Sequence, residues 1–444
     1  MENGSRSGSK RQTVRVDTRR ALRYAPACRD VTHGGAAIPT RRTPRAGALQ
    51  GTLVLDLTWI LSGPFCTMTL ADMGARVIKV ERPDGGDMAR GNGPFIHGES
   101  SYFLSVNRGK ESIALNLASP EGKELFLRLV DRADVAVENF VPGAMRRLGL
   151  DYAVLRRRNP RLVYCAISGF GQTGPYAERP ALDVIVQGMG GIMSITGEGP
   201  GRPPVRPGAS MGDISAGLFA AVAILAALRE RDRSGRGQML DISMLDCQLA
   251  IQENAFTRYF ATGEVPQPLG TRHPIFTPFQ AFQTRDGWIV VAVVGGVNDQ
   301  WPLFCAAIDH VELIDDPRFK DGYARTLNYA ALEPALNEAM RRRTSEEWLA
   351  EFAKAGIACG PVNTIAQVAH DPQVAARGMF VDVPLKTRSR RKAKVVNSPI
   401  RMSRTPPRVA RGCPALGEHT QAVLGEFLGL TPDDVNALHT RGVV

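Results

Sequence analysis

One carboxylate stands where it could act as a nucleophile. Asp213 lies within PGASMGDISAGLFAAVAILAALRERDRSGRG (207–237), between two glycine-containing turns and directly before a long apolar segment. An aspartate at a helix start often caps the helix and gains from its dipole. Its side chain has an unperturbed pKa of about 3.9, so at neutral pH it can also attack a carbonyl carbon without a general base. Backbone N–H groups at the helix start would then stabilise the oxyanion. Cap and nucleophile both remain open from these residues alone.

Two other catalytic patterns are present in the sequence but lack the structural setting that they need. GFGQTG (169–174) has the spacing of a dinucleotide-binding fingerprint, but Pro175 and Pro180 follow it, which favours a loop over a helix that holds a pyrophosphate. GASMG (208–212) has the spacing of a nucleophile elbow around Ser210. The proline-rich text before it cannot form the required central strand. Hydride transfer and serine hydrolysis are therefore disfavoured.

The cysteines and histidines show no metal-binding spacing. Seven cysteines are scattered without a C-x-x-C pair, and seven histidines form no H-E-x-x-H motif. This pattern predicts reduced thiols in the core of an intracellular protein, with no disulfide framework and no metal site. The longest apolar run, residues 217–228, is too short to span a bilayer, so we expect a soluble protein that does not enter the membrane.

The positive charge is concentrated near the N-terminus. Residues 1–47 carry eleven lysines and arginines against three acids, which accounts for +8 of the total charge of +11. The rest of the chain is nearly balanced, which argues against nucleic-acid binding. We predict a disordered basic leader over 1–48 and a cytoplasmic protein. A mitochondrial location is the alternative if the leader is a targeting segment.

Strand-like and helix-like segments alternate from residue 51 onward. We expect parallel strands at 51–58, 75–83, 112–117, 133–140 and 161–170, with helices at 64–73, 119–133 and 214–231. This alternation predicts an α/β protein with a doubly wound, Rossmann-like parallel sheet that binds ligands at the carboxyl ends of its strands. After a further strand in 237–246, a helix is expected to run towards Ala261.

The sequence texture changes near residue 265. Two apolar stretches flank Arg285-Asp286-Gly287, a hairpin signal, and Thr344 with Glu347 forms a capping box at the start of a later helix. We therefore predict a large domain over 49–264 with a linker helix, a smaller α+β domain over 265–345, and a segment over 346–444 that returns to the large domain.

The ordered set of motifs resembles the type III CoA-transferases, the family of formyl-CoA transferase and succinyl-CoA–dicarboxylate CoA-transferase. The resemblance runs from about Leu49 to the C-terminus. It is carried by VLDLTWILSGP (54–64), GARVIKVERPDGGDMAR (74–90), NRGKESIALNL (107–117), VENFVPGAMRRLGL (137–150), SGFGQTGPY (168–176), MGDISAG (211–217), GRGQMLDISMLD (235–246), GIACGPV (356–362) and LGEHT (416–420).

The resemblance implies a mechanism and a set of contacts with coenzyme A. Asp213 matches the family's nucleophilic aspartate, which passes through an aspartyl-CoA thioester and needs neither a metal nor a tightly bound cofactor. The positions that match CoA contacts in the family are Ile60, Leu61, Ser62, Arg82, Leu115, Asn139, Phe140 and Arg147. Arginines suit the phosphates of CoA because they offer paired N–H donors. The family also implies a homodimer in which the two chains are interlocked.

Three departures from formyl-CoA transferase bear on the substrate. Leu61 replaces an assisting glutamine, Ser168 replaces a lysine, and GTRHPIFTPFQAF (270–282) stands where a glycine-rich loop is expected. Formyl-CoA and oxalate are therefore disfavoured as substrates. The stretch GTRHPIFTPFQAF resembles the family members that act on dicarboxylates. Succinyl-CoA or another short dicarboxylyl-CoA is the expected donor, with Arg272 and His273 as candidates for a distal carboxylate.

Two alternatives stay open. An α-methylacyl-CoA racemase shares this fold, but Leu182 stands where the racemase has its histidine, directly before Asp183. A leucine cannot carry a proton, so Asp183 is expected to assist or orient the site, or to cap a helix. The second alternative is a CoA-binding protein without catalysis, which the intact MGDISAG motif disfavours.

Overall fold

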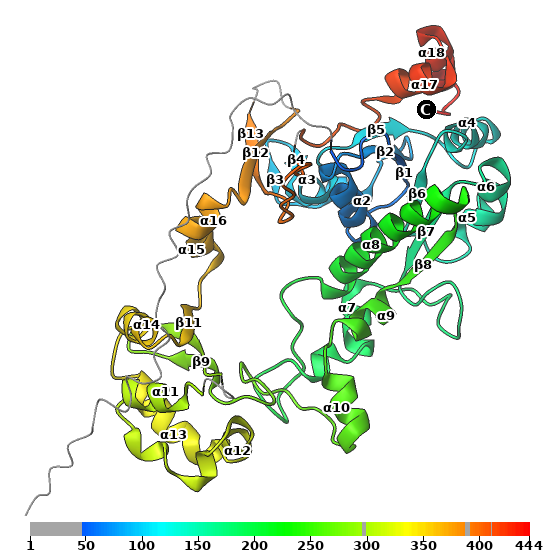
Figure 1. Ribbon diagram of the computed structural model, residues 1–444. Helices are drawn as coiled ribbons and strands as arrows, with labels where there is room; N and C mark the ends of the chain where they lie inside the picture. The colour runs from blue at the N-terminus through cyan, green and yellow to red at the C-terminus, as the bar shows by residue number, and fades with distance from the viewer. Residues whose placement is uncertain (1–46, 295–298, 387–390, 410) are drawn as a thin grey trace, which may run out of the picture. The chain divides into compact units, whose positions relative to one another are not determined.

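The chain divides into two compact units. The computed structural model describes residues 47–294, 299–386, 391–409 and 411–444 (Figure 1). Within these ranges, residues 47–270 and 365–444 form the larger unit and residues 271–364 form the smaller one. The larger unit is thus assembled from two stretches of the chain. The basic leader predicted over 1–48 lies almost entirely outside the described residues.

The larger unit is built on a six-stranded parallel sheet with the order β5-β2-β1-β6-β7-β8. Its strands are β1 (Leu53–Asp56), β2 (Arg76–Glu81), β5 (Glu111–Ala114), β6 (Val135–Glu138), β7 (Val163–Ser168) and β8 (Met239–Ser243). The chain moves outward from β1 to β5, then returns to pair β6 with the free side of β1. The carboxyl ends of β1 and β6 therefore form the switch point where ligands bind in such sheets.

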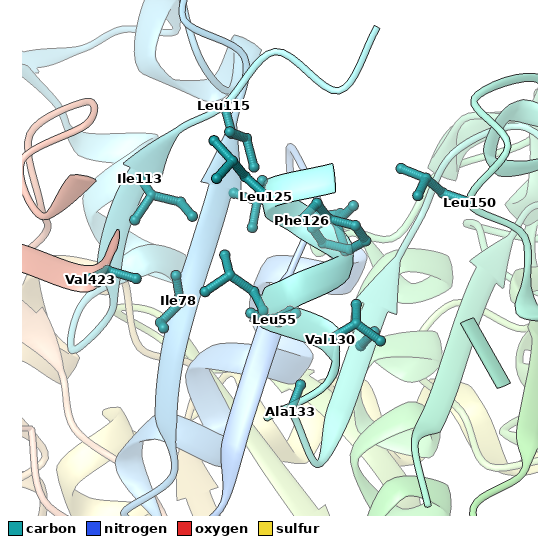
Figure 2. Close-up of a cluster of buried hydrophobic side chains, with 14 of the residues drawn as sticks. Leu55, Ile78, Ile113, Leu115, Leu125, Phe126, Val130, Ala133, Leu150 and Val423 are labelled. Atoms are coloured by element: carbon teal, nitrogen blue, oxygen red, sulfur yellow. The ribbon is translucent and has the colours of Figure 1, made fainter. Parts of the chain in front are cut away.

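Each face of the sheet is covered by helices. Leu53 and Leu55 of β1 point to one face and Val54 to the other, as the alternation of a strand requires. The first face packs against α4 (Pro120–Val130), α5 (Ala144–Arg147), α6 (Tyr152–Arg158), α17 (Thr420–Leu428) and α18 (Pro432–Thr440). Figure 2 shows this core around Leu55 and Phe126. The second face packs against α2 (Ser62–Asp72), α7 (Asp183–Met189), α8 (Met211–Ser234) and α9 (Met244–Ala250).

The C-terminal segment covers the open edge of the sheet at β5. The backbone N–H of His419 donates to Ser112 O at 2.8 Å, and its ring Nδ1 accepts from Ser112 N at 3.2 Å. Thr420 Oγ1 accepts from Ala114 N at 2.9 Å. An edge strand with unpaired backbone groups is a template for aggregation, so these contacts protect it.

The smaller unit contains the predicted hairpin. β9 (Phe279–Gln283) and β10 (Trp288–Ala292) pair antiparallel, and β11 (Ala358–Pro361) adds to β10. Its helices are α11 (Trp301–Ala307), α12 (Gly322–Leu327), α13 (Tyr329–Met340) and α14 (Ser345–Lys354), and the capping box of Thr344 and Glu347 is present at α14. The expected end of this domain at residue 345 is too early. Trp348 and Phe352 of α14 are buried in this unit's core, so the unit extends to Thr364.

Two further features of the larger unit were not foreseen. A small antiparallel pair, β12 (Phe380–Pro384) and β13 (Lys392–Val396), packs with α3 (Ser101–Asn107) in a separate apolar cluster. The helix expected to run from β8 towards Ala261 is broken into α9 and α10 (Ala255–Thr262). The break contains Glu253, whose φ of 42° is incompatible with a continuous right-handed helix. The remaining strands and α-helices are short: β3 (Phe95–Ile96), β4 (Glu99–Ser100), α15 (Ile365–Ala369) and α16 (Pro372–Ala376).

Candidate active site

Asp213 lies in the first turn of α8 but does not cap it. Ser210 occupies the cap position and makes no capping hydrogen bond with its side chain. The backbone N–H groups of Gly212 and Asp213 instead donate to Asp183 Oδ1, at 2.9 and 3.4 Å. The cap interpretation of Asp213 is therefore wrong, because Asp183 supplies the cap from the start of α7. These two N–H groups are also already paired, so the oxyanion role expected of them falls to other donors.

A second helix begins beside Asp213. The hydroxyl and the backbone N–H of Ser62, the first residue of α2, both donate hydrogen bonds to the Asp213 carboxylate. Gly217 makes the approach of α2 and α8 possible, because a Cβ at that position would lie only 2.6 Å from Ser62 O. Asp213 therefore sits at the N-terminal ends of two helices, where partial positive charge favours an anion.

The pKa of Asp213 is raised to about 7. Burial is the largest cause, because it disfavours the charged form, and the negative charge of Asp183 adds to it. The hydrogen bonds from Ser62 and the charge of Arg206 lower the pKa in part. A carboxylate that ionises near neutral pH is more basic than an ordinary aspartate, and perturbed groups of this kind cluster at functional sites.

Asp183 is held in place by side chains of its own helix and of the loop before α8. Its Oδ2 accepts from Gln187 Nε2 at 2.7 Å and from Arg206 Nη2 at 3.2 Å. Because both carboxylate oxygens of Asp183 are engaged, its orientation towards the Asp213 turn is well defined. In the structure Asp183 thus caps the start of α8, and its assisting or orienting role towards a substrate stays a prediction.

Tyr102 lies close enough to the two carboxylates to feel their charge, which sequence reasoning missed. Burial raises the pKa of its hydroxyl, and the charges of Asp213 and Asp183 raise it further. This long-range effect places the phenol in the field of both carboxylates. Tyr102 belongs to α3, which is more than a hundred residues before Asp213 in the chain. No local pattern in the sequence signals this proximity, whereas the spacing of four between Asp183 and Gln187 could have indicated that pair.

A cavity of about 240 Å³ opens at the carboxyl ends of β1, β2, β5 and β6. Its walls are formed by Leu57, Thr58, Trp59, Val80, Glu81, Arg82, Gly86, Asp87, Leu115, Asn116, Leu117, Ala118 and Phe140. Three of the predicted CoA contacts, Arg82, Leu115 and Phe140, are among these residues. The cavity therefore lies at the switch point of the sheet, where the doubly wound fold predicts a ligand.

Asn139 connects the cavity wall to the Asp213 side of the site. Its Oδ1 accepts from Trp59 N at 3.0 Å, and its Nδ2 donates to Trp59 O at 2.9 Å and to Ser62 Oγ at 3.2 Å. The ring of Phe140 packs edge-on against that of Trp59, with centroids 5.6 Å apart. The turn from Trp59 to Ser62, which contains Ile60 and Leu61, therefore runs from the cavity to the carboxylate.

Some predicted residues do not join this group. Arg147 is exposed on α5 and is not part of the cavity wall. In the smaller unit, the Arg272 guanidinium lies over the Tyr329 ring, 4.2 Å from its centroid. His273 Nδ1 accepts from the backbone N–H groups of Ile275 and Phe276, both at 3.1 Å. Arg272 and His273 thus have partners within that unit, and their role towards a substrate stays a prediction.

Within the described ranges, no three histidine, cysteine or acidic side chains gather as a group that could hold a metal ion. The cysteines in these ranges are free thiols. The site itself offers the chemistry of its carboxylates, its hydroxyl groups and its helix N-termini. A partly buried carboxylate with a raised pKa, next to a cavity in a doubly wound sheet, suits nucleophilic attack on an acyl group.

Comparison with known proteins defines the family. Residues 49–420 match CoA-transferase family III. The chain is 44% identical over 344 residues to the acetyl-CoA:oxalate CoA-transferase of Acetobacter aceti, covering 77% of this chain and 88% of that protein. It is 39% identical over 397 residues to the succinyl-CoA:glutarate CoA-transferase of Mus musculus, covering 89% of this chain and 90% of the relative. The solved structure of a CAIB/BAIF family protein from Brucella suis has a TM-score of 0.76 and 40% identity, covering 86% of this chain and all of that one. The chain belongs to CoA-transferase family III and is an enzyme that transfers CoA.

Proposed function

We propose that this enzyme moves CoA from succinyl-CoA, or another short dicarboxylyl-CoA, to a carboxylic acid through a thioester on Asp213. The Asp213 carboxylate attacks the donor thioester, the C–S bond breaks, and a mixed anhydride and CoA thiolate form. The thiolate then attacks the Asp213 carbonyl carbon, which releases the donor acid and leaves aspartyl-CoA. The acceptor carboxylate attacks this thioester and displaces the thiolate, and the thiolate finally takes the acceptor's acyl group and frees Asp213.

The observation that carries this proposal is the environment of Asp213. Its carboxylate is partly buried, has a pKa of about 7 and accepts from the N–H and hydroxyl of Ser62. Burial keeps water away from an anhydride and a thioester, both of which water would hydrolyse. When Asp213 becomes an acyl group, the same Ser62 donors are placed to stabilise the oxyanion on its carbonyl oxygen.

We further propose that the cavity binds one end of CoA. Leu115 and Phe140 give it apolar walls for the adenine, and Arg82 offers a guanidinium for a phosphate. The turn of Ile60, Leu61 and Ser62 would guide the pantetheine arm towards Asp213. Arg147 remains a candidate for a phosphate further along the surface. CoA enters here as a substrate.

A donor and acceptor panel tests the substrate class. Two relatives are named for glutarate and oxalate, both dicarboxylic acids. One relative is named for oxalate, so oxalate belongs in the panel although the sequence disfavours it as a substrate of this chain. Succinate, glutarate and oxalate should accept CoA better than butyrate and acetate. If only monocarboxylates accepted CoA, the dicarboxylate proposal would be wrong.

The rate of CoA transfer should fall as the pH drops through about 7. Only the ionised carboxylate attacks, so kcat/KM for the acyl-CoA donor should rise to a plateau above the pKa of Asp213. Asp183→Asn keeps an oxygen that can accept from Gly212 N but removes the charge that raises this pKa. The midpoint should then move to lower pH. An unchanged midpoint in Asp183→Asn would contradict this assignment.

We also propose that the protein is a homodimer. The long helix α8 is apolar enough in composition to cross a membrane, but half of that apolar stretch is buried in the larger unit. Its other side exposes Leu218, Phe219 and Val222. An exposed apolar strip of this kind marks an interaction site, and the interlocked dimer of the family would cover it. Light scattering of the purified protein should give twice the chain mass.

We propose the cytoplasm as the location of the protein.

A further inference from the structure

Ile60 adopts a backbone conformation that its side chain disfavours. Its φ is 65°, in the left-handed region, and among the described residues it is the only β-branched residue with a positive φ. A branched Cβ clashes with the backbone in this region, and glycine is the residue that adopts it readily. Strain of this kind persists where the surrounding structure imposes it, and it is commonly found at ligand-binding sites.

Asp87 accepts a hydrogen bond from the backbone of Ile60. Its Oδ1 accepts from Ile60 N at 3.0 Å and also from Ala89 N at 2.9 Å. Asp87 belongs to the loop after β2, so this hydrogen bond joins that loop to the turn that contains Ile60. The backbone N–H of Asp87 donates to Glu81 Oε2 at 3.0 Å, which fixes the loop in turn.

Lys79 contacts both Asp87 and the backbone just before the turn. Its Nζ lies 2.9 Å from Asp87 Oδ2 and donates to Thr58 O at 2.5 Å, two residues before Ile60. The side chains of Lys79 and Asp87 are almost completely buried. Burying two charges costs free energy that a well-packed apolar pair would not, so this ion pair is poorly explained by stability alone. Its contacts converge instead on the backbone of residues 58–60.

We infer that Asp87 and Lys79 are positioning residues for acyl-CoA binding, because they hold Ile60 in its left-handed conformation. This inference rests on the proposed function, in which the turn from Ile60 to Ser62 meets CoA. Ile60 starts the approach to Ser62, which donates to Asp213. If Ile60 relaxed to a negative φ, the path of the chain would change just before Ser62 and the cavity wall at Trp59.

The test is a set of variants that separates backbone strain from side-chain loss. Asp87→Ala should weaken the binding of CoA, measured by titration calorimetry, by about tenfold or more. Asp87→Asn retains an acceptor for Ile60 N and should stay closer to wild type. Adding Ile60→Gly to Asp87→Ala should restore much of the affinity, because glycine adopts the left-handed conformation without help. Ile60→Ala removes nearly the same side chain but keeps a Cβ, so it should restore less of the affinity than Ile60→Gly.

The outcomes are separable. Equal recovery by Ile60→Gly and Ile60→Ala, or unchanged CoA affinity in Asp87→Ala, would overturn the inference. Asp87→Ala could fail to fold because Lys79 loses its partner. In that case the double variant Lys79→Met with Asp87→Leu replaces the ion pair by apolar groups. Ile60→Gly and Ile60→Ala are then compared in that background. If wild-type enzyme bound no CoA, the proposed cavity would be wrong. If it bound CoA without any effect of Asp87, only the positioning role would fail.

Discussion

Replacing Asp213 with asparagine should reduce CoA transfer on the order of 10³-fold or more, because the amide cannot attack a thioester. The side chain keeps its size and can still accept from Ser62, so binding of CoA should change little. Initial rates of CoA transfer, together with calorimetric titration of CoA, separate these two effects. Asp246→Asn is a matched control, since Asp246 also lies in the first turn of a helix, α9, but is exposed. A variant that transferred CoA at more than a tenth of the wild-type rate would contradict the role of Asp213.

The same variant should show a stability signature. The folded-state pKa of Asp213, about 7, is above its unfolded value, so the folded protein binds more protons between about pH 4 and pH 7. Stability from this group is therefore lost as the pH rises through that window. Asp213→Asn cannot ionise, so its stability does not fall in this pH window. The difference in melting temperature between Asp213→Asn and wild type should therefore be larger at pH 8 than at pH 5. A gain that did not depend on pH would indicate a cause other than the buried charge.

Removing Lys110 should have the second largest effect, on stability. Lys110 and Asp56 are fully buried, with Nζ 2.9 Å from Oδ2, and Lys110 also donates to Pro64 O at 3.1 Å. Burial would raise the pKa of Asp56, but the charges of Lys110 and Lys79 outweigh it and lower the pKa. Lys110→Met leaves the Asp56 carboxylate without its direct partner. The free energy of unfolding should fall by about 3–5 kcal/mol, as measured by denaturant titration.

A double variant distinguishes an unpaired charge from a lost side chain. Adding Asp56→Asn to Lys110→Met removes the orphaned charge while an amide can still accept from Thr67 Oγ1, which lies 2.7 Å from Asp56 Oδ2. The double variant should therefore be more stable than Lys110→Met alone. Lys123→Met serves as the control, because Lys123 makes no ion pair within the described residues. Equal losses in the single and double variants would show that packing, and not charge, is what Lys110 supplies.

The sheet and its helices follow from local sequence, and much of the site does not. The buried strands could be predicted because each is a short apolar run between turn signals, and Ser119 caps α4 as expected. Asp213 could be placed at a helix start, but which carboxylate caps that helix could not. Asp183 reaches Gly212 at the start of α8 across 29 residues of the chain, and Asp87 reaches Ile60 across 27. Such contacts depend on the order of the strands in the sheet. The spacing of apolar residues along the sequence does not contain that order.

The departures have physical causes of the same kind. The returning segment was expected to begin at residue 346, because α14 reads as an ordinary amphipathic helix that could cover either unit. Trp348 and Phe352 pack in the core of the smaller unit, so α14 belongs to that unit. The left-handed conformation of Ile60 could not be predicted either, since isoleucine disfavours it and its backbone N–H bonds to Asp87, 27 residues away.

Mass spectrometry of the Asp213 peptide shows whether CoA transfer passes through a covalent intermediate on this residue. The enzyme is incubated with succinyl-CoA and other acyl-CoA donors without an acceptor acid, then digested, with and without hydroxylamine. We predict CoA on the peptide that contains Asp213, conversion of that adduct to a hydroxamate by hydroxylamine, and neither product in Asp213→Ala. An enzyme that transfers CoA to an acceptor with these donors, yet yields only unmodified Asp213 peptide, would contradict a covalent aspartyl intermediate.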